Sequence, residues 1–262
     1  TSTTVNSAIA IGDEAQATAD QAVAIGKKAH ASGVNAFAQG NTSSATAESS
    51  IAMGTNSNAG GTASTVIGMS STVNGTHSGL IGTAMSTDNN QSGTTLNGSD
   101  TYVVGNGNGT VGGTNSSIVG NSNTVGTTVK DSDGIDHSYN TVNTSILGNN
   151  NTVTAQDADV IGHGNTVGKK NLNAAGVADG TVDTAAGSGV LGANNTVYGS
   201  GNKVIGNNNN DADLDSVFIL GNNVTAGLEN SAYIGSGSAY VVSGTTTAGA
   251  DSYGSVTVGD GT

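Results

Sequence analysis

Hydrophobic positions along the chain recur with a fixed period that is marked by glycine. From Gly12 to Gly82 a glycine that follows an apolar residue, or once Gln39, returns every 14 residues. The landmark continues to Gly259, and of its fourteen intervals eight are 14 residues, two are 15 and four are longer. The landmark glycines are Gly12, Gly26, Gly40, Gly54, Gly68, Gly82, Gly105, Gly120, Gly148, Gly162, Gly192, Gly206, Gly221, Gly235 and Gly259. This period indicates a repeat architecture in which each unit packs on its neighbours.

The residues before each glycine predict a short strand. In the first four units apolar residues stand one and three positions before the glycine, Gln39 excepted, with a small alanine between them, as in Ile9-Ala10-Ile11, which is typical of a strand with one packed face. From Val66 onward the residue two positions before the glycine is also large. Adjacent strand residues point to opposite faces, so both faces become apolar. One face can fill a narrow coil interior, and the other needs cover from a second chain.

Nine residues are therefore candidates for the intermolecular interface or for the core. They share the position two before the landmark glycine: Val66, Leu80, Val103, Ile118, Ile146, Val160, Val190, Val204 and Ile219.

The residues after each glycine predict a second short strand. Five positions after it stands Ala or Val, and three positions after it many later units carry Asn, in the recurring phrase Asn-Thr-Val at 123–125, 151–153, 165–167 and 195–197. Stacked Asn residues at one phase can hydrogen-bond along the array. Two strands and two tight turns in 14 residues make a flattened β-coil, and 15 coils spaced by about 4.8 Å give a rod of about 70 Å. Frequent glycine disfavours helix throughout.

The long intervals predict insertions at about 83–101, 127–144, 168–188 and 240–255. Gly134 and Gly176 fall in phase, which leaves open that two insertions hide degraded coils, although the polar residues 131–133 favour a loop. We expect a single domain over 1–262, with regular coils in 5–82 and insertion-bearing coils in 83–262. Insertions on a regular repeat usually form surface loops, often on the binding side.

Composition and charge narrow the function. The chain has 42 glycines, no proline, no cysteine and a net charge of −13, with only six basic residues. So few cations cannot hold many phosphates, and we therefore expect no nucleic acid and no anionic membrane as a partner. No apolar run approaches the roughly 20 residues of a membrane span, so any membrane anchor lies outside this fragment. The absence of proline fits coils that donate backbone hydrogen bonds throughout.

Candidate chemistry is sparse. The four histidines share no spacing, and no set of residues is forced to converge as an active site requires, so we expect no enzyme and no cofactor. The acidic runs 131–136 and 211–215 are the best candidates for Ca²⁺, but neither completes a known calcium loop and we expect no metal. If one insertion contacts a protein ligand, the candidates are Asp133, Asp136, His137 and Tyr139, because Tyr and His are good interface anchors.

The repeats resemble the YadA-like heads of trimeric autotransporter adhesins of Gram-negative bacteria. The stretches that carry the resemblance are 7–12 (Ser-Ala-Ile-Ala-Ile-Gly), 21–26 (Gln-Ala-Val-Ala-Ile-Gly) and 49–54 (Ser-Ser-Ile-Ala-Met-Gly). The resemblance implies an all-β fold, a left-handed parallel β-roll solenoid with about 14 residues per coil, and a homotrimer at the bacterial cell surface whose stalk and outer-membrane anchor lie elsewhere. It also implies a host cell-surface or matrix protein, or another bacterial surface, as the binding partner.

Three other functions stay open at this stage. A structural spacer in a surface fibre has the same sequence pattern as an adhesin head. An ice-binding β-solenoid is suggested by the threonine of Asn-Thr-Val, although these threonines occupy only four or five scattered coils. A carbohydrate-active β-helix enzyme has longer coils and a recurring acidic cluster, which this chain lacks.

Overall fold

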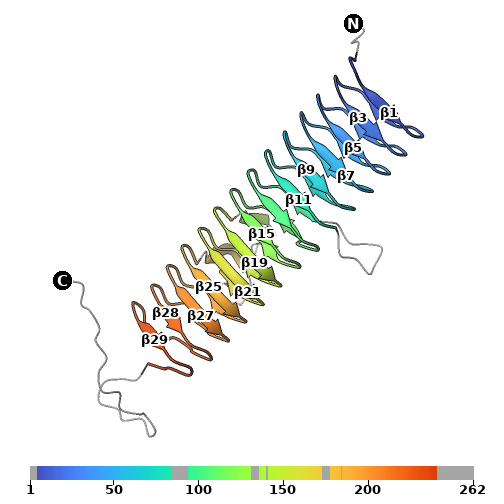
Figure 1. Ribbon diagram of the computed structural model, residues 1–262. Helices are drawn as coiled ribbons and strands as arrows, with labels where there is room; N and C mark the ends of the chain where they lie inside the picture. Colours follow the sequence, from blue (N-terminus) through green and yellow to red (C-terminus); the bar gives the residue numbers. More distant parts are fainter. Residues whose placement is uncertain are drawn as a thin grey trace, which may run out of the picture.

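The computed structural model describes residues 5–83, 94–130, 136–139, 141–172, 178–183 and 185–240. These residues stack as parallel coils into a straight rod, with β1 at one end and β29 at the other (Figure 1). Within these ranges there is no helix, so no helix of the described chain is long or apolar enough to cross a membrane. The all-β solenoid expected from the sequence is confirmed.

One long side of the coils forms a 14-stranded parallel sheet. Its strands, in the order in which they pair, are β1 (Ile9–Ile11), β3 (Val23–Ile25), β5 (Phe37–Gln39), β7 (Ile51–Met53), β9 (Thr65–Ile67), β11 (Gly79–Ile81), β13 (Tyr102–Val104), β15 (Ser117–Val119), β19 (Ser145–Asn149), β21 (Asp159–His163), β25 (Gly189–Ala193), β27 (Lys203–Asn207), β28 (Phe218–Leu220) and β29 (Ala232–Ile234).

The opposite side forms an 11-stranded sheet of two-residue strands. They are β2 (Gln16–Ala17), β4 (His30–Ala31), β6 (Ser44–Ala45), β8 (Asn58–Ala59), β10 (Thr72–Val73), β12 (Thr95–Leu96), β14 (Thr110–Val111), β16 (Thr124–Val125), β20 (Thr152–Val153), β22 (Thr166–Val167) and β26 (Thr196–Val197).

The register between coils reproduces the sequence period. Ile9 pairs with Val23 and Ile11 with Ile25, so equivalent positions of successive coils stack directly. The stacking continues across the longer intervals, where Val119 still pairs with Leu147 and Ile161 with Leu191. Each insertion therefore leaves the coil order intact, and equivalent residues form continuous columns along the rod.

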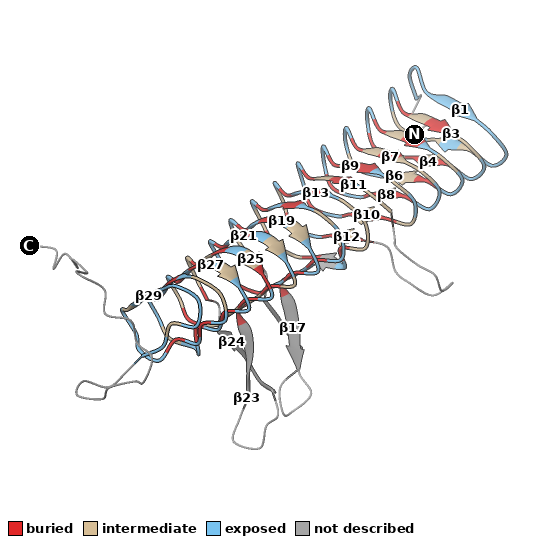
Figure 2. Cartoon of the chain, turned by 60° about the horizontal axis from the view of Figure 1, so that its bottom comes forward, coloured by how far each residue is buried: buried red, intermediate tan, exposed pale blue. Residues whose placement is uncertain are grey.

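The core is a thin layer between the two sheets. Buried side chains follow the inner walls of the coils, while the turns and the outer faces are more accessible (Figure 2). In the first four coils this layer is alanine, as at Ala24, Ala38 and Ala52, and from Val66 onward it is valine, isoleucine and leucine. A coil of 14 residues has no space for a thicker interior, because stacked sheets lie about 10 Å apart.

The landmark glycine directly follows most strands of the 14-stranded sheet and lies inside β19, β21, β25 and β27, and most of these glycines have a positive φ that other residues rarely adopt. Gly120 has a φ of +139°, and a Cβ added to it would lie 1.7 Å from the carbonyl oxygen of Gly148 in the next coil. Both the backbone angle and the close stacking require glycine. This explains why glycine, rather than the apolar residue before it, carries the period.

Two of the insertions are antiparallel hairpins and not degraded coils. The first hairpin pairs β17 (Thr127–Lys130) with β18 (Asp136–Tyr139), and the second pairs β23 (Lys169–Leu172) with β24 (Ala178–Asp183). The in-phase Gly134 and Gly176 lie outside the described residues, as do the extra residues 84–93 and the expected insertion 240–255 beyond Tyr240. The described strands of these two insertions pair with each other and add no strand to either sheet of the rod.

Candidate functional site

The outer face of the 14-stranded sheet carries a line of side chains that are aliphatic at every described position except Gln39. We call the residues immediately before the landmark glycines the outer rank. Its described members are Ile11, Ile25, Gln39, Met53, Ile67, Ile81, Val104, Val119, Leu147, Ile161, Leu191, Ile205, Leu220 and Ile234. Leu147 is 54% exposed and Leu191 48%, although both are large apolar residues at the centre of the sheet. A contiguous exposed apolar surface of this length is typical of an interaction site.

The nine residues that were candidates for the interface or the core all lie inside the solenoid. Leu80, Ile118 and Ile219 are fully buried within one chain, and the most accessible of the nine, Val190, is only 3% exposed. Since the coil itself covers them, they cannot contact a second chain. The unpaired apolar face belongs to the outer rank, one residue later in each strand.

In the first four coils the outer face carries two apolar columns. The residues three before the glycine, which we call the second rank, are Ile9, Val23, Phe37 and Ile51 there, and they share the outer face with the outer rank. The packed interior face of these coils is alanine, so the interpretation that the large residues form the packed face of a single coil was wrong. In these four coils the interior position is held by alanine, and the larger side chains point away from it.

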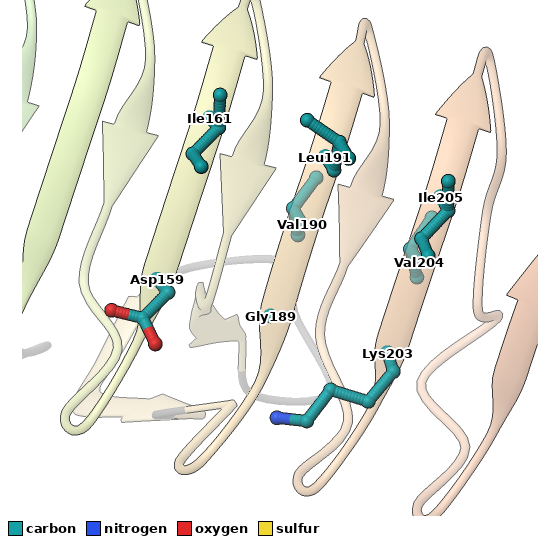
Figure 3. Close-up of a pocket in the computed structure, with 8 residues that line it drawn as sticks. All are labelled: Asp159, Ile161, Gly189, Val190, Leu191, Lys203, Val204 and Ile205. Atoms are coloured by element: carbon teal, nitrogen blue, oxygen red, sulfur yellow. The ribbon is translucent and has the colours of Figure 1, made fainter.

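Farther along the rod the second rank becomes polar and leaves a groove. Asp159, Gly189 and Lys203 occupy consecutive strands of this column. The side chain of Lys203 lies across Gly189, and its Nζ donates a hydrogen bond to the carbonyl of Gly187 (Figure 3). The groove is lined on its apolar side by Ile161, Leu191 and Ile205 of the outer rank. The outer rank therefore stays apolar where the second rank does not.

A buried asparagine ladder joins the later coils. The Asn165 side-chain nitrogen donates to Asn151 Oδ1 at 3.0 Å and to the carbonyl of Gly192 at 2.9 Å, and Asn195 repeats the arrangement one coil on. The ladder also includes Asn108, Asn123 and Asn209, all buried. The stacking expected from the Asn-Thr-Val phrase is confirmed, and each buried amide is satisfied by its neighbours.

The ladder region ends at a buried carboxylate that the sequence analysis considered only as a calcium candidate. Asp211 stands five residues after Gly206, at the position where earlier coils place valine, and it is fully buried. Its oxygens accept hydrogen bonds from the backbone amides of Tyr198, Gly199 and Asp213 and from the side chain of Asn202. Burial raises the pKa of Asp211, and these hydrogen bonds oppose the rise.

This carboxylate takes the place of a backbone carbonyl of the next coil, where the pairing of the 11-stranded sheet continues only as a single bridge between Thr196 and Asn210. In earlier coils the amide after the strand donates to a backbone carbonyl of the next coil, as Gly126 donates to Val153. After β26, the last strand of that sheet, Tyr198 and Gly199 donate to Asp211 instead. The oxygens of Asp211 thus serve the backbone, and among the described residues no three His, Cys, Asp or Glu side chains gather as a metal site.

The candidate ligand-binding residues lie in or beside the first hairpin. Asp136, His137 and Tyr139 belong to β18, and Asp133 lies outside the described residues. The two hairpins leave the 11-stranded sheet at equivalent glycines, Gly126 after β16 and Gly168 after β22, which both have positive φ. With β20 between them, their bases are two strands apart, about 10 Å, which is the spacing of packed sheets. Accordingly β17 and β18 both contact β24.

Threonine forms a second uninterrupted column, on the 11-stranded sheet. The first residue of seven consecutive strands, β10 to β26, is threonine: Thr72, Thr95, Thr110, Thr124, Thr152, Thr166 and Thr196. The expectation that these threonines occupy scattered coils was wrong, because the insertions that separate them in sequence are looped out. Each strand has only two residues, so the column is one residue wide.

The histidines do not converge in the described chain. His30 begins β4, His163 ends β21, and exposed His77 lies 3.7 Å from the carboxylate of Asp100. These positions are on different coils and different faces of the rod. The arrangement of the described residues therefore presents long faces and not a concave reaction centre.

These features define the class of protein as a parallel β-solenoid with one continuous apolar outer face. Residues 6–29 and 31–57, which hold β1 to β7, each match the family model of the YadA head domain repeat, so the first coils are similar to YadA head repeats. The match confirms the resemblance to a YadA-like trimeric autotransporter adhesin head. No curated protein matches the chain.

Proposed function

We propose that the chain is a non-enzymatic head of a bacterial cell-surface adhesin and that it works as a homotrimer. The YadA head repeats of residues 6–57 support the class. The observation that carries the proposal is the outer rank, because it extends the exposed aliphatic face of those four coils without a gap in register to Ile234. One interface can therefore run along the whole described rod.

The trimer would turn weak contacts into firm attachment. Three copies present each lateral surface and each loop three times, so the second and third contacts form at a high effective concentration. The expected partner is a host cell-surface or matrix protein, or another bacterial surface. The expected location is the exterior of an outer membrane, held by an anchor outside residues 1–262.

The paired hairpins are the proposed contact with that partner. They interrupt an otherwise uniform rod, and they carry Asp136, His137 and Tyr139 on β18. The contacts of β17 and β18 with β24 support treating both hairpins as one projection. Asp133, which precedes β18 in the sequence, belongs to the same proposal.

Light scattering of the purified fragment over a range of concentrations tests the assembly. A mass of three chains supports the proposal, and a monomer at every concentration contradicts it. Binding to immobilised matrix proteins and to host and bacterial cells then tests adhesion. A variant in which short glycine linkers replace residues 127–140 and 169–184 should lose binding, whereas a matched variant without residues 84–93 should keep it. Equal binding by both variants would exclude the hairpins, and a trimer that binds no surface would favour a spacer.

Ice binding is a second candidate because of the unbroken threonine column on β10 to β26. Hydroxyls repeated at about 4.8 Å along a rigid sheet suit an ordered water lattice. A column one residue wide supports this function less well than a broad array would. Thermal hysteresis measured for the fragment and for Thr124→Tyr, which places a bulky ring in the column, decides the point. Ice binding requires thermal hysteresis in the unmodified chain and its loss in Thr124→Tyr.

A further inference from the structure

One residue interrupts the aliphatic outer rank. Gln39 ends β5 and stacks in register between Ile25 and Met53. It is exposed, and the other thirteen described members of the rank are Ile, Leu, Val or Met. Along the part of the rod that the structure describes, the amide of Gln39 is thus a single polar group in a long apolar column.

Gln39 lies in the most apolar part of the outer face. Phe37, on the same strand, and Val23 and Ile51, on the neighbouring strands, form the second rank at this level, and all three are only partly exposed. No hydrogen bond to the Gln39 side chain is formed by any residue of the described chain. The amide therefore stands without a protein partner in an apolar surround.

If a second chain covers this face, the amide of Gln39 is buried without a hydrogen bond unless that chain supplies a donor or an acceptor. A glutamine amide offers two donors and an acceptor with two lone pairs. A buried polar group without a hydrogen bond costs about 1–3 kcal/mol. A closed homotrimer about an axis parallel to the rod brings the same residue of each copy to the same height. The natural partners of one Gln39 amide are then the Gln39 amides of the other two copies.

We propose that the three Gln39 side chains hydrogen-bond to one another in a polar layer that fixes the register of the trimer. The inference rests on the proposed homotrimer. A slip by one coil, about 4.8 Å, would still place aliphatic side chains against aliphatic side chains at nearly every other level. At the level of Gln39 it would place an amide against Ile25 or Met53, with no hydrogen bonds. A single polar residue in an apolar seam sets register in this way, at some cost in stability.

The first test replaces Gln39 with glutamate, which has a similar shape and carries a charge. The matched control is Gln16→Glu, because Gln16 is an exposed glutamine on the outer side of β2 in the other sheet. At pH 7.5 we expect Gln39→Glu to weaken trimerisation at least about 100-fold, because buried unpaired charges cost several kcal/mol. Near pH 4 the carboxyls protonate and the trimer should recover, since the ordinary pKa of Glu is about 4.3. Gln16→Glu should match the wild type at both values.

The second test removes the amide while keeping the shape, with Gln39→Met. We expect this trimer to be as stable as the wild type or more stable, but to lose its single register. The chain has no cysteine, so Met53→Cys and Ile67→Cys can be introduced in separate chains and mixed. Disulfides form only between Cα atoms less than about 7 Å apart. Links between position 53 of one copy and position 67 of another should be rare when the chains keep Gln39 and frequent when they carry Gln39→Met.

The outcomes separate this inference from the proposed function. A wild-type monomer overturns both. A wild-type trimer in which Gln39→Glu behaves as Gln16→Glu overturns the polar layer and leaves the trimer standing. A Gln39→Met trimer with no increase in 53–67 links shows that register is fixed elsewhere and likewise overturns the inference. Loss of the trimer at pH 7.5, its return at pH 4 and slipped links in Gln39→Met together support it.

Discussion

The coils of β1 to β8 and those of β15 to β27 have the same backbone arrangement, but their large apolar side chains are distributed differently between the outer face and the interior. In β1 to β8 the interior is alanine, and the large side chains of the outer and second ranks face outward. In β15 to β27 the interior is Ile118, Val160 and their equivalents, and the second rank is polar. A fully buried isoleucine or valine contributes about 1.5–3 kcal/mol, far more than a methyl group. The early coils must therefore take more of their stability from whatever covers their outer face.

Polar side chains in the turns follow the same division. Ser43 and Ser57 donate to Gly40 and Gly54, three residues earlier in their own coils. The buried asparagines at the equivalent turn instead bond to the preceding coil, as Asn165 bonds to Asn151. The late coils are thus tied to one another by side chains as well as by backbone. With the proposed trimer, a single repeat is therefore stabilised between chains in the early coils and within the chain in the late coils.

The largest effect is expected from a charge in the outer rank. Ile25→Asp should abolish the trimer and also unfold the first coils, because their alanine interior cannot hold them once the outer face is exposed. Leu191→Asp, at the same position of a late coil, should weaken the trimer but leave its coil folded. Each buried charge costs several kcal/mol. Light scattering reports the mass, and hydrogen exchange resolved by coil reports folding. Equal exchange in the two variants would contradict the division between early and late coils.

A matched pair of neighbours sharpens the distinction between interior and outer face. Ile146 is buried and Leu147, the next residue, is 54% exposed. Ile146→Ala should lower the free energy of unfolding of one chain by about 2–5 kcal/mol through loss of burial and a residual cavity. Leu147→Ala should change it little under conditions where the chain is monomeric, and should weaken assembly instead. Denaturant unfolding of dilute and concentrated samples separates the two effects.

A smaller loss is expected from the turn ladders. Asn151→Ala leaves the amide nitrogen of Asn165 and the carbonyl of Gly162 without partners, and should cost about 1–3 kcal/mol per unsatisfied group. Ser57→Ala removes one bond within a coil and should cost about 0.5–1.5 kcal/mol. Thermal unfolding of both variants shows which substitution lowers the stability more. A larger loss for Ser57→Ala would place the stronger ladder in the early coils.

The smallest effect is a dependence of the free energy of unfolding on pH, caused by Asp211 beside the last strand of the 11-stranded sheet. The raised pKa of Asp211 means that the folded chain holds its proton at pH values where the unfolded chain has lost it. The unfolded state then binds fewer protons, so the stability that this group confers falls as pH rises from about 3.8 through the raised pKa. Asp211→Asn should lack this component. The free energy of unfolding is measured for both proteins between pH 3 and 8, and the difference between them isolates the contribution of Asp211. A difference that does not change with pH would contradict a raised pKa of Asp211.

Much of the fold follows from the sequence because one residue type carries the period. Only glycine fits where Gly120 packs on Gly148, so the coils, their two strands and the asparagine column can be located from glycine alone. The direction of the strand faces could not be predicted, since Val66 and Ile67 are both apolar and alternation does not say which is inside. The structure places Ala38 in the interior and Phe37 on the outer face, and at the same register position Val66 in the interior and Ile67 outside.

The candidate site could be predicted only in part. The paired apolar residues indicated a second apolar face, but the sequence left open which member of each pair lies on it. The hairpins could not be recognised from the sequence, because the in-phase glycines of these insertions, Gly134 and Gly176, left degraded coils open as an alternative. Asp211 gave no sequence signal for its role, because three of its four donors are backbone amides and the fourth, Asn202, is brought to it by the fold.

The direct stacking of each coil on the previous one has a consequence for how the chain reaches its final shape. Every strand of the 14-stranded sheet pairs with the strand one coil earlier, and no strand of that sheet waits for a distant segment. Contacts between residues that lie close together in the sequence favour fast, stepwise folding. Each finished coil presents an open backbone edge on which the next can form, in the manner of a zipper closing from one end. A chain delivered end first and unfolded could therefore assemble at the pace of its delivery, with the last completed coil as the template.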